Sequence, residues 1–208
     1  MKLIISESGV LEKVEILEEA EVVIPDGVTS IGDKAFYENY SLLTGVIIPD
    51  SVTTIGEDAF MDCNLLESAI ISNSTTSIGG RAFAWCESLT SVVIPGSVMS
   101  IGDKAFYDCS SLADVTISHG VPYLGNEMFY LCSSLASIVV PASVLSIGEY
   151  AFERCRSLTS VTIMNGKTVI DHDAFSMCNE DLIIRAPVGS YVEQYAVKNG
   201  IKFEAIRP

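Results

Sequence analysis

A phenylalanine recurs along this chain at a nearly constant interval, and this interval limits the possible folds more than any other feature. Successive members lie 24 residues apart once and then 23 residues apart five times; they are Phe36, Phe60, Phe83, Phe106, Phe129, Phe152 and Phe175. Repeats of about 20–50 residues are typical of solenoids and related arrays. The sequence therefore predicts an elongated stack of about seven similar coils, each of which contacts only its neighbours.

Each repeat shares a pattern that predicts its secondary structure. Residues 97–122 read SVMSIGDKAFYDCSSLADVTISHGVP, and the shared positions are Ile-Gly-x-x-Ala-Phe-x-x-Cys-x-x-Leu-x-x-Val-x-Ile. The alternation in Val-x-Ile predicts a short strand with Val and Ile directed inward and the residue between them directed outward. Such strands are expected to stack into a parallel sheet; they lie at residues 22–24, 46–48, 69–71, 92–94, 115–117, 138–140, 161–163 and 182–184.

A second, shorter extended stretch follows each strand, as at residues 98–102, and ends at a glycine. A glycine at one fixed corner indicates either a positive φ or a close approach of another backbone. The segment after the glycine, residues 103–109 in one repeat, is too short for an isolated helix. It predicts a single helical turn held by packing, with the phenylalanines stacked as a ladder in the core. The corner glycines are Gly32, Gly56, Gly79, Gly102, Gly125 and Gly148.

These elements predict a strand-dominated solenoid in the α/β class. The parallel sheet is expected on the concave face, with the second extended stretch and the helical turns on the other side. The repeats occupy residues 22–184. Residues 1–21 do not fit the repeat and predict two short strands around a turn at Gly9, which would form an N-terminal cap over the first coil.

The last segment, residues 185–208, predicts a C-terminal cap of one helix and one strand. Ser190 is a suitable N-cap for the helix YVEQYAVK, and Asn199 and Gly200 are suitable for its end. The segment IKFEAI then predicts a final strand. Residues 1–208 are therefore expected to form one domain with a cap at each end.

The chain is strongly acidic, with 12 Lys and Arg against 27 Asp and Glu and a net charge of −15. This balance disfavours binding to nucleic acid, which needs a concentrated basic patch, and to anionic membrane surfaces. An acidic surface is typical of a soluble protein that repels other copies; an acidic face for a basic partner is the alternative. No stretch approaches the roughly 18 apolar residues of a membrane-spanning helix. The first residues also lack the apolar core and cleavage site of a signal peptide.

Six cysteines follow the same period: Cys63, Cys86, Cys109, Cys132, Cys155 and Cys178. An even number of cysteines raises the possibility of disulfides. Equivalent atoms in neighbouring coils lie about 4.8 Å apart and point the same way, whereas a disulfide joins Cβ atoms about 3.8 Å apart that face each other. Zinc needs ligands that converge on one point. We therefore expect a ladder of reduced, buried thiols that pack as small apolar groups.

The residues offer no constellation for catalysis, a cofactor or a metal. His119 and His172 lie at different phases of different repeats, and neither has a repeat-phase serine or cysteine that would form a nucleophile–base pair. His172, between Asp171 and Asp173, is expected to be a solvated surface residue. The carboxylates of the loops are expected to form a solvated face; they are Asp33, Glu57, Asp103 and Glu149. No enzymatic activity and no cofactor are expected.

Two rows of surface residues are candidates for an interaction site. The first occupies the outward position of the main strands, where six of eight residues are aliphatic; its members are Val23, Ile47, Ile70, Val93, Thr116, Val139, Thr162 and Ile183. An exposed apolar patch indicates an interaction site, although Val, Ile and Thr also favour strands for their own sake. The second row is largely aromatic and comprises Tyr37, Met61, Trp85, Tyr107 and Tyr130. Tyr and Trp favour interfaces, and the alternative is that these rings shield the gaps between coils.

The repeat unit, Ile-Gly-x-x-Ala-Phe-x-x-Cys-x-x-Leu-x-x-Val-x-Ile-Pro, resembles the BspA-like leucine-rich repeats found in many bacterial surface proteins. The segment SYVEQYAVKNGIKF resembles the usual ending of such arrays. The resemblance implies a surface, adhesion or protein-interaction module and a location at the cell surface or outside the cell.

The leading hypothesis is a non-enzymatic module that binds a protein or a glycan through its sheet face. The alternative is a structural spacer or a self-associating surface protein in which the apolar row mates with another copy. A monomer is expected under the first hypothesis, and self-association under the second. Neither hypothesis involves nucleic acid or insertion into a membrane.

Overall fold

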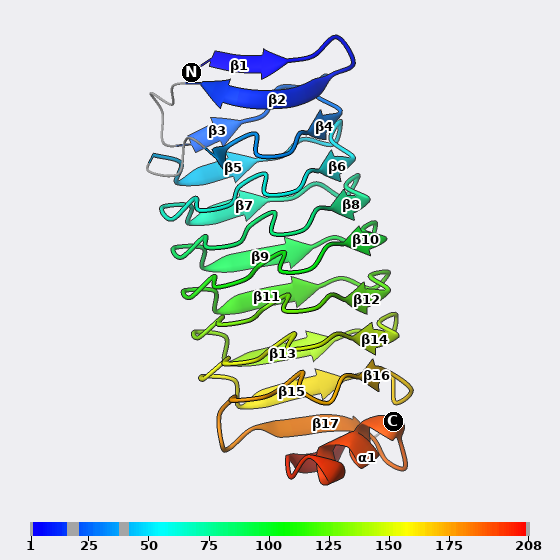
Figure 1. The fold of residues 1–208 in the computed structure, drawn as a ribbon. Helices are drawn as coiled ribbons and strands as arrows, with labels where there is room; N and C mark the ends of the chain where they lie inside the picture. The colour runs from blue at the N-terminus through cyan, green and yellow to red at the C-terminus, as the bar shows by residue number, and fades with distance from the viewer. Residues whose placement is uncertain (1, 16–20, 38–41, 207–208) are drawn as a thin grey trace.

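The computed structural model of the protein describes residues 2–15, 21–37 and 42–206, which form one column of stacked coils (Figure 1). An N-terminal hairpin of antiparallel strands β1 (Lys2–Ile5) and β2 (Val10–Glu15) begins the column. Its turn contains Gly9 at a φ of 82°. Helix α1 (Tyr191–Lys198) and strand β18 (Lys202–Ile206) lie at the other end. The strand-dominated solenoid with a cap at each end, predicted from the period, is thereby confirmed.

Two sides of the column are sheets and the third consists of turns. The longer strands form the main sheet side: β3 (Glu21–Val23), β5 (Gly45–Ile47), β7 (Ser68–Ile70), β9 (Ser91–Ile94), β11 (Asp114–Ile117), β13 (Ser137–Val140), β15 (Ser160–Ile163) and β17 (Ile183–Pro187). Two-residue strands form the second sheet side: β4 (Ser30–Ile31), β6 (Thr54–Ile55), β8 (Ser77–Ile78), β10 (Ser100–Ile101), β12 (Tyr123–Leu124), β14 (Ser146–Ile147) and β16 (Val169–Ile170). The segments that lead from the second sheet side to the next main strand form the turn side (Figure 1).

Equivalent residues of successive coils lie side by side. On the main sheet side Val46 pairs with Val22 and with Ala69, all in parallel register. On the second sheet side Ile55 pairs with Ile31 in the same way. Parallel stacking of the recurrent strands is therefore confirmed, and it follows from the strict period, because only in-register stacking lets every coil bury the same positions.

Both sheets are interrupted at one boundary, between the coil of β11 and the coil of β13. On the main sheet side the hydrogen-bonded strands are β3, β5, β7, β9 and β11, and a separate sheet contains β13, β15, β17 and β18. On the second sheet side one sheet ends at β10 and the next begins at β12. The sequence predicts continuous stacking, and this expectation is wrong at that boundary.

Prolines account for the interruption. At the boundary before it, the amide of Met99 donates a hydrogen bond of 2.8 Å on the second sheet side and that of Ser118 donates one of 3.0 Å on the main sheet side. One repeat later these positions are Pro122 and Pro141, which have no N–H to donate. Pro95 removes the equivalent amide from the main sheet side alone, and β7 and β9 still pair there. The sheets separate where proline occupies both positions.

The turn side remains hydrogen bonded across the same boundary. The amides of Lys104, Phe106 and Asp108 donate to carbonyl oxygens of the next coil at 2.9, 3.0 and 2.7 Å. Lys104 and Asp108 have positive φ angles of 62° and 52°, and equivalent residues recur in the other coils. These left-handed residues direct alternate amides toward the neighbouring coil. The segment is consequently a succession of turns, and the single helical turn predicted from the sequence is wrong.

The corner glycines allow neighbouring coils to approach closely. A Cβ atom on Gly102 would lie 2.3 Å from the amide nitrogen of Gly80, and one on Gly56 would lie 2.6 Å from that of Asp33. Neither Gly102 nor Gly56 has a positive φ. Close backbone approach, one of the two explanations that the sequence leaves open, is therefore the correct one at these corners.

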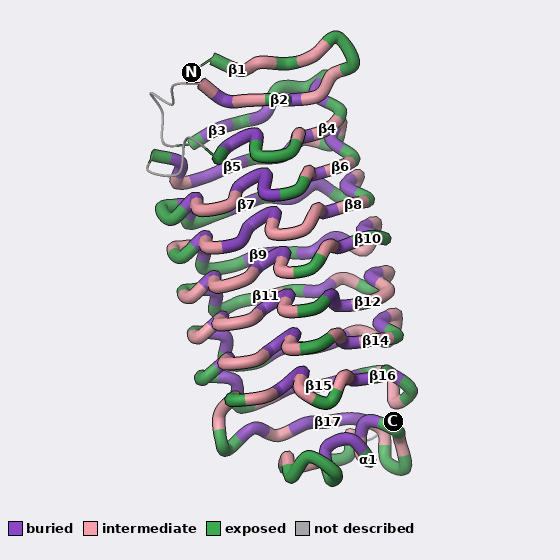
Figure 2. The backbone as a smooth tube through the Cα atoms, in the orientation of Figure 1, coloured by how far each residue is buried: buried purple, intermediate pink, exposed green. Residues whose placement is uncertain are grey.

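A column of phenylalanine rings runs through the core. Neighbouring ring centroids lie between 4.5 Å apart, for Phe36 and Phe60, and 5.6 Å apart, for Phe106 and Phe129. The predicted phenylalanine ladder is thus confirmed. Figure 2 shows that buried positions recur in every coil. Burial of the apolar surface of each ring contributes about 2–3 kcal/mol to the free energy of unfolding.

Helix α1 covers the C-terminal end of this core. Its N-cap, Ser190, accepts a hydrogen bond of 3.1 Å from the amide of Glu193, and Gly200 follows it at a φ of 68°, as predicted. The helix buries Val192, Tyr195 and Ala196. No helix in the described part of the chain is long and apolar enough to cross a bilayer.

Candidate interaction surface

The predicted row of outward strand residues lies on the main sheet side with its side chains in solvent. The exposed fractions of Val23, Ile47, Ile70, Val93 and Val139 range from 43% to 60%. Pairing in register places the first three side by side, and it also places Val93 beside Thr116 and Val139 beside Thr162. These residues face outward because strand residues alternate, while the residues on either side of them enter the core. We call the N-terminal part of this row, Val23, Ile47, Ile70 and Val93, the aliphatic row.

The prediction that Ile183 is the last member of this outward row is wrong. Ile183 pairs with Ser160, and Arg185 is the residue that pairs with Thr162. The reason is that the 23-residue period continues into β17 without shortening, so Ile184 aligns with Val161. The main sheet side therefore ends on a charged residue.

Arg185 is held by two contacts on this surface. Its Nε atom lies 2.8 Å from Oε2 of Glu204 on β18, and its Nη1 atom donates to Ser160 Oγ at 2.6 Å. The C-terminal part of the main sheet side is accordingly polar, whereas the N-terminal part carries the aliphatic row.

The outward positions beside the aliphatic row are small or acidic. They are Glu21, Gly45, Ser68 and Ser91. A Cβ atom on Gly45 would lie 3.2 Å from Cγ of Glu21 and 3.3 Å from Oγ of Ser68, so these two side chains flank the glycine. These positions therefore carry no large apolar side chain that would cover the aliphatic row.

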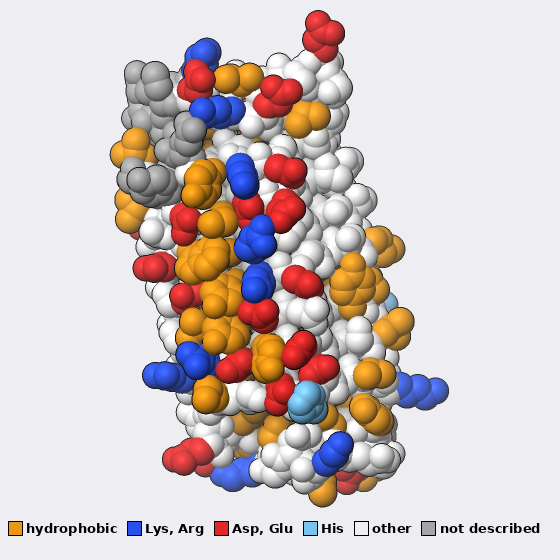
Figure 3. All heavy atoms as spheres, viewed as in Figure 1, with side chains coloured by type: hydrophobic (Ala, Val, Ile, Leu, Met, Phe, Trp, Pro, Cys, Tyr) orange, Lys and Arg blue, Asp and Glu red, His pale blue; other side chains and the backbone are white. Residues whose placement is uncertain are grey.

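The aromatic row lies on the turn side, where its rings contact one another. Tyr107 and Tyr130 stack at 4.8 Å with an interplanar angle of 7°, and Trp85 lies 5.2 Å from Tyr107 at 57°. Lys104 Nζ lies 5.7 Å from the Tyr107 ring centroid. Figure 3 shows a column of apolar side chains on this side, next to basic and acidic groups. Because the ring faces are covered by neighbours, this geometry favours the shielding of gaps between coils.

Ion pairs run beside the aromatic row. The Arg81 guanidinium donates to Asp58 Oδ1 at 2.7 Å and to Glu57 Oε1 at 2.6 Å. Lys104 Nζ lies 3.3 Å from Oε1 of Glu127. These pairs join neighbouring coils, and the hydrogen bonds to Asp58 raise the pKa of Arg81.

The loop carboxylates that the sequence assigns to a solvated face are exposed, and some of them also bind backbone. Asp33 Oδ1 accepts a hydrogen bond of 2.8 Å from the amide of Glu57 in the next coil. Asp103 Oδ1 accepts one of 3.0 Å from the amide of Asn126. Their phase in the repeat is therefore explained by contacts between coils, which the sequence pattern alone does not reveal.

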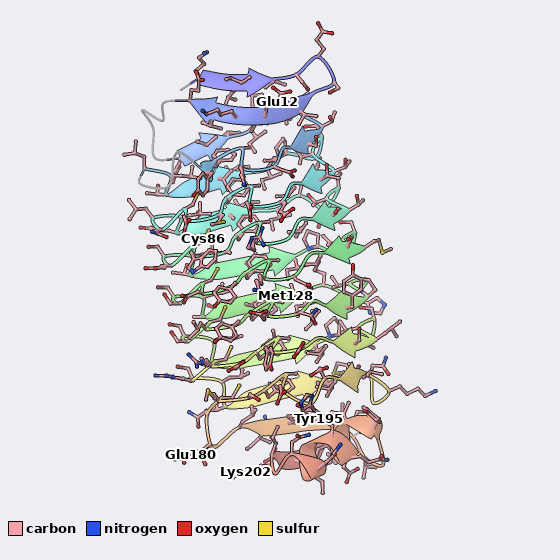
Figure 4. All side chains as sticks on the ribbon, viewed as in Figure 1. Glu12, Cys86, Met128, Glu180, Tyr195 and Lys202 are labelled. Carbon is pink, nitrogen blue, oxygen red and sulfur yellow. The ribbon has the colours of Figure 1, made fainter. Side chains whose placement is uncertain are left out.

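The cysteines form the predicted ladder and remain free thiols. Five of them donate through Sγ to a phenylalanine carbonyl oxygen of the preceding coil at 3.1–3.3 Å; they are Cys86, Cys109, Cys132, Cys155 and Cys178. Cys86 is labelled in Figure 4. Burial raises the pKa of every one of the six thiols, and that of Cys63 to about 12. Since a nucleophilic or metal-binding cysteine must be a thiolate, the ladder is structural.

The two histidines lie on the surface, as predicted for His172, and at different places in the fold. His119 is exposed in the turn after β11. His172 Nδ1 lies 3.2 Å from Asp171 Oδ1, and His172 Nε2 lies 2.6 Å from Asp173 Oδ2. His172 is exposed and the two aspartates are half-buried, and both imidazole nitrogens already contact carboxylates.

The interruption of the sheets opens a crevice that the repeat pattern of the sequence does not predict. A crevice of about 420 Å³ opens between β11 and β13, lined by residues of both strands. It lies between Thr116 and Val139, and Val115 beneath it is only partly buried. The sequence signal is the pair Pro122 and Pro141, which becomes visible only when both proline positions are compared across all repeats.

Comparison with known proteins agrees with this architecture. The family model for the BspA type leucine rich repeat region matches residues 18–80 and 55–182. No curated protein matches the chain at a significant level. Among solved structures, a leucine-rich repeat protein of T. pallidum is 28% identical, with 98% of this chain and 94% of that chain covered and a TM-score of 0.73.

Two further structures extend the comparison. A leucine-rich repeat protein from Bacteroides ovatus is 27% identical, with a TM-score of 0.60, and the match covers 90% of this chain and 61% of that one. A leucine rich cell surface protein from Faecalibacterium prausnitzii is 20% identical, with coverage of 99% and 93% and a TM-score of 0.54, which shows a shared fold. The family model covers well over half of the sequence, and the matched residues lie in the stacked coils of the structure. The chain therefore belongs to the BspA-type leucine-rich repeat family.

Proposed function

We propose that this protein is a non-enzymatic binding module that holds a protein partner, or a protein-borne glycan, against its main sheet side. The observation that carries the proposal is the aliphatic row, four large side chains on successive strands with roughly half of their surface in solvent. Contiguous apolar surface of this kind marks interaction sites, and solenoids present extended surfaces to their partners. Covering each side chain would contribute up to about 1–2 kcal/mol.

The contacts of the other candidate residues support this choice. The rings of Trp85, Tyr107 and Tyr130 already contact one another on the turn side. Five of the six thiols are buried and burial raises the pKa of all six, while the histidines contact acids or lie alone on the surface. The aliphatic row is the candidate whose side chains have their apolar surface free.

The experiment replaces Ile70→Lys together with Val93→Lys and uses the protein to capture partners from a native cell-surface fraction and the surrounding medium. Both side chains are more than half exposed, so the fold should persist with a loss of about 1 kcal/mol or less. The matched control is Met99→Lys with Leu145→Lys, which charges two equally exposed residues outside the row. The proposal expects capture by the wild type and the control and loss of capture by the row variant. Equal capture by all three proteins would remove the row as the site.

A second candidate function, self-association through the same row, is tested by light scattering across protein concentration. A mass that rises with concentration in the wild type and stays constant in the row variant would support it. A strict monomer argues for a separate partner. A location at the cell surface, which the family and the description of the Faecalibacterium structure support, is tested by protease shaving of intact cells.

A further inference from the structure

Basic residues are confined to one side of most of this column. Between Val14 and Glu153 the chain contains three Lys or Arg residues, Lys34, Arg81 and Lys104. All three occupy the same phase of the repeat, with positive φ angles of 57°, 51° and 62° on the turn side. The strands from β3 to β13 therefore carry no basic residue on either sheet side.

The three basic residues are also neutralised where they lie. Lys34 Nζ is 3.9 Å from Asp58 Oδ2, and Arg81 binds both Asp58 and Glu57. Lys104 pairs with Glu127. Their charges act on the turn side and do not offset acidic groups elsewhere on the column.

The main sheet side carries acids around the aliphatic row. Glu21 lies on the sheet beside Val23, Glu67 directly precedes β7, and Asp114 begins β11. Two further carboxylates lie in the turns that follow β3 and β5, namely Asp26 and Asp50. All five are exposed, and none is in ion-pair contact with a basic residue of the described chain. The aliphatic row therefore has exposed carboxylates on both of its sides. We call these five carboxylates the acidic margins.

We infer that the partner's docking segment is a cationic, apolar polypeptide, in which alternate aliphatic residues cover the aliphatic row while Lys or Arg side chains reach the acidic margins. This inference rests on the proposed function and names the chemistry of the partner. The row from Val23 to Val93 crosses four strands, a span of about 14 Å, which four or five extended residues cover. Long basic side chains suit the margins because their stems pack on apolar surface while their charged ends reach carboxylates.

The same charges argue against other occupants. A second copy docked face to face would place acidic margins against acidic margins, which is unfavourable for like charges. Anionic lipid and nucleic acid are repelled by these carboxylates for the same reason. A basic polypeptide alone combines apolar contact with neutralisation of the margins.

The test measures the binding of three synthetic 12-residue peptides to the full chain by calorimetry at low and high salt. The peptides alternate Leu with Lys, Leu with Glu, and Ser with Lys. The charge variant is Glu21→Gln with Glu67→Gln, and its matched control is Glu149→Gln with Glu180→Gln, two exposed acids outside the coils that carry the aliphatic row. The row variant, Ile70→Lys with Val93→Lys, is measured in parallel.

The inference expects binding of the Leu-Lys peptide that weakens with salt, and weak or no binding of the other two peptides. The charge variant should lose about threefold to tenfold in affinity, and its control should be unchanged. If the Leu-Glu peptide binds as tightly as the Leu-Lys peptide, the inference that the partner is cationic is overturned, while the aliphatic row remains a binding site. Equal binding of the Ser-Lys peptide, or an equal loss in the control, would show attraction to overall charge and overturn the inference. Unchanged binding by the row variant would overturn the proposed function itself.

Discussion

The thiol of Cys109 donates a hydrogen bond of 3.1 Å to the carbonyl oxygen of Phe83 in the preceding coil. That oxygen also accepts the amide of Cys86 within its own coil, at 3.3 Å. The cysteine ladder thus uses the second acceptor position of a buried carbonyl beside the phenylalanine column. A cysteine at this phase fills a small buried space and satisfies a polar atom, so the repeat needs no disulfide to join its coils.

Burial of these thiols predicts a loss of stability in base. The ordinary pKa of a cysteine, 9.0, is raised to about 12 for Cys63 and for Cys178. The folded state therefore keeps its protons while the unfolded state loses them, so the stabilisation is fully present below pH 9 and declines as the pH rises toward about 12. Urea unfolding midpoints should fall over this window.

The control for this prediction is Cys63→Ala, which removes one titrating thiol. Its midpoint should fall less steeply with pH than that of the wild type over the same window. Identical slopes for the two proteins would show that the thiol is not responsible.

The phenylalanine column predicts a large effect of one truncation at its centre. Phe106 is fully buried and stacks on Phe83 at 5.3 Å and on Phe129 at 5.6 Å. Phe106→Ala should lower the free energy of unfolding by about 3–5 kcal/mol, because the cavity interrupts two ring contacts. Tyr107→Ala, one residue away on the partly exposed aromatic row, should cost about 1–2 kcal/mol. Urea denaturation followed by circular dichroism measures the free energy of unfolding of both variants. Equal losses would contradict the placement of Phe106 in the core.

The interrupted sheets predict a local difference in hydrogen exchange. The backbones of Ser137 and Val139 face the crevice, whereas their equivalents Asp114 and Thr116 face the paired strand β9. The amides of Ser137 and Val139 should therefore exchange faster. Pro122→Thr restores an amide at this boundary on the second sheet side and should slow exchange in the coil of β13. Equal protection of the two pairs of amides in the wild type would contradict an open boundary.

The strict period made the core and the outward positions predictable. One repeat unit assigns Ile101 and Phe106 to the interior, and their equivalents are buried in every coil because stacked coils must bury the same positions. The outward position of the strands follows from the alternation around Val93 in the same way.

Three features escaped prediction for identifiable physical reasons. Left-handed residues at Lys104 and Asp108 leave no signal in composition, because neither is a glycine. The outward position predicted at Ile183 is two residues out of register, because the apolar run at residues 182–184 fits the strand pattern as well as the true register does. The open boundary depends on Pro122 and Pro141 acting together, since β7 and β9 still pair at Ser68 and Ser91 where Pro95 is the only proline.

The most direct test of the central claim, that the aliphatic row is the binding surface, is the dissociation constant of the captured partner for three proteins. These are the wild type, the variant Ile70→Lys with Val93→Lys, and the control Met99→Lys with Leu145→Lys. The account predicts that the constant rises at least about tenfold in the row variant and is unchanged in the control, because charged side chains cannot be buried against an apolar partner segment without a large desolvation cost. A row variant that binds as tightly as the wild type would contradict the account.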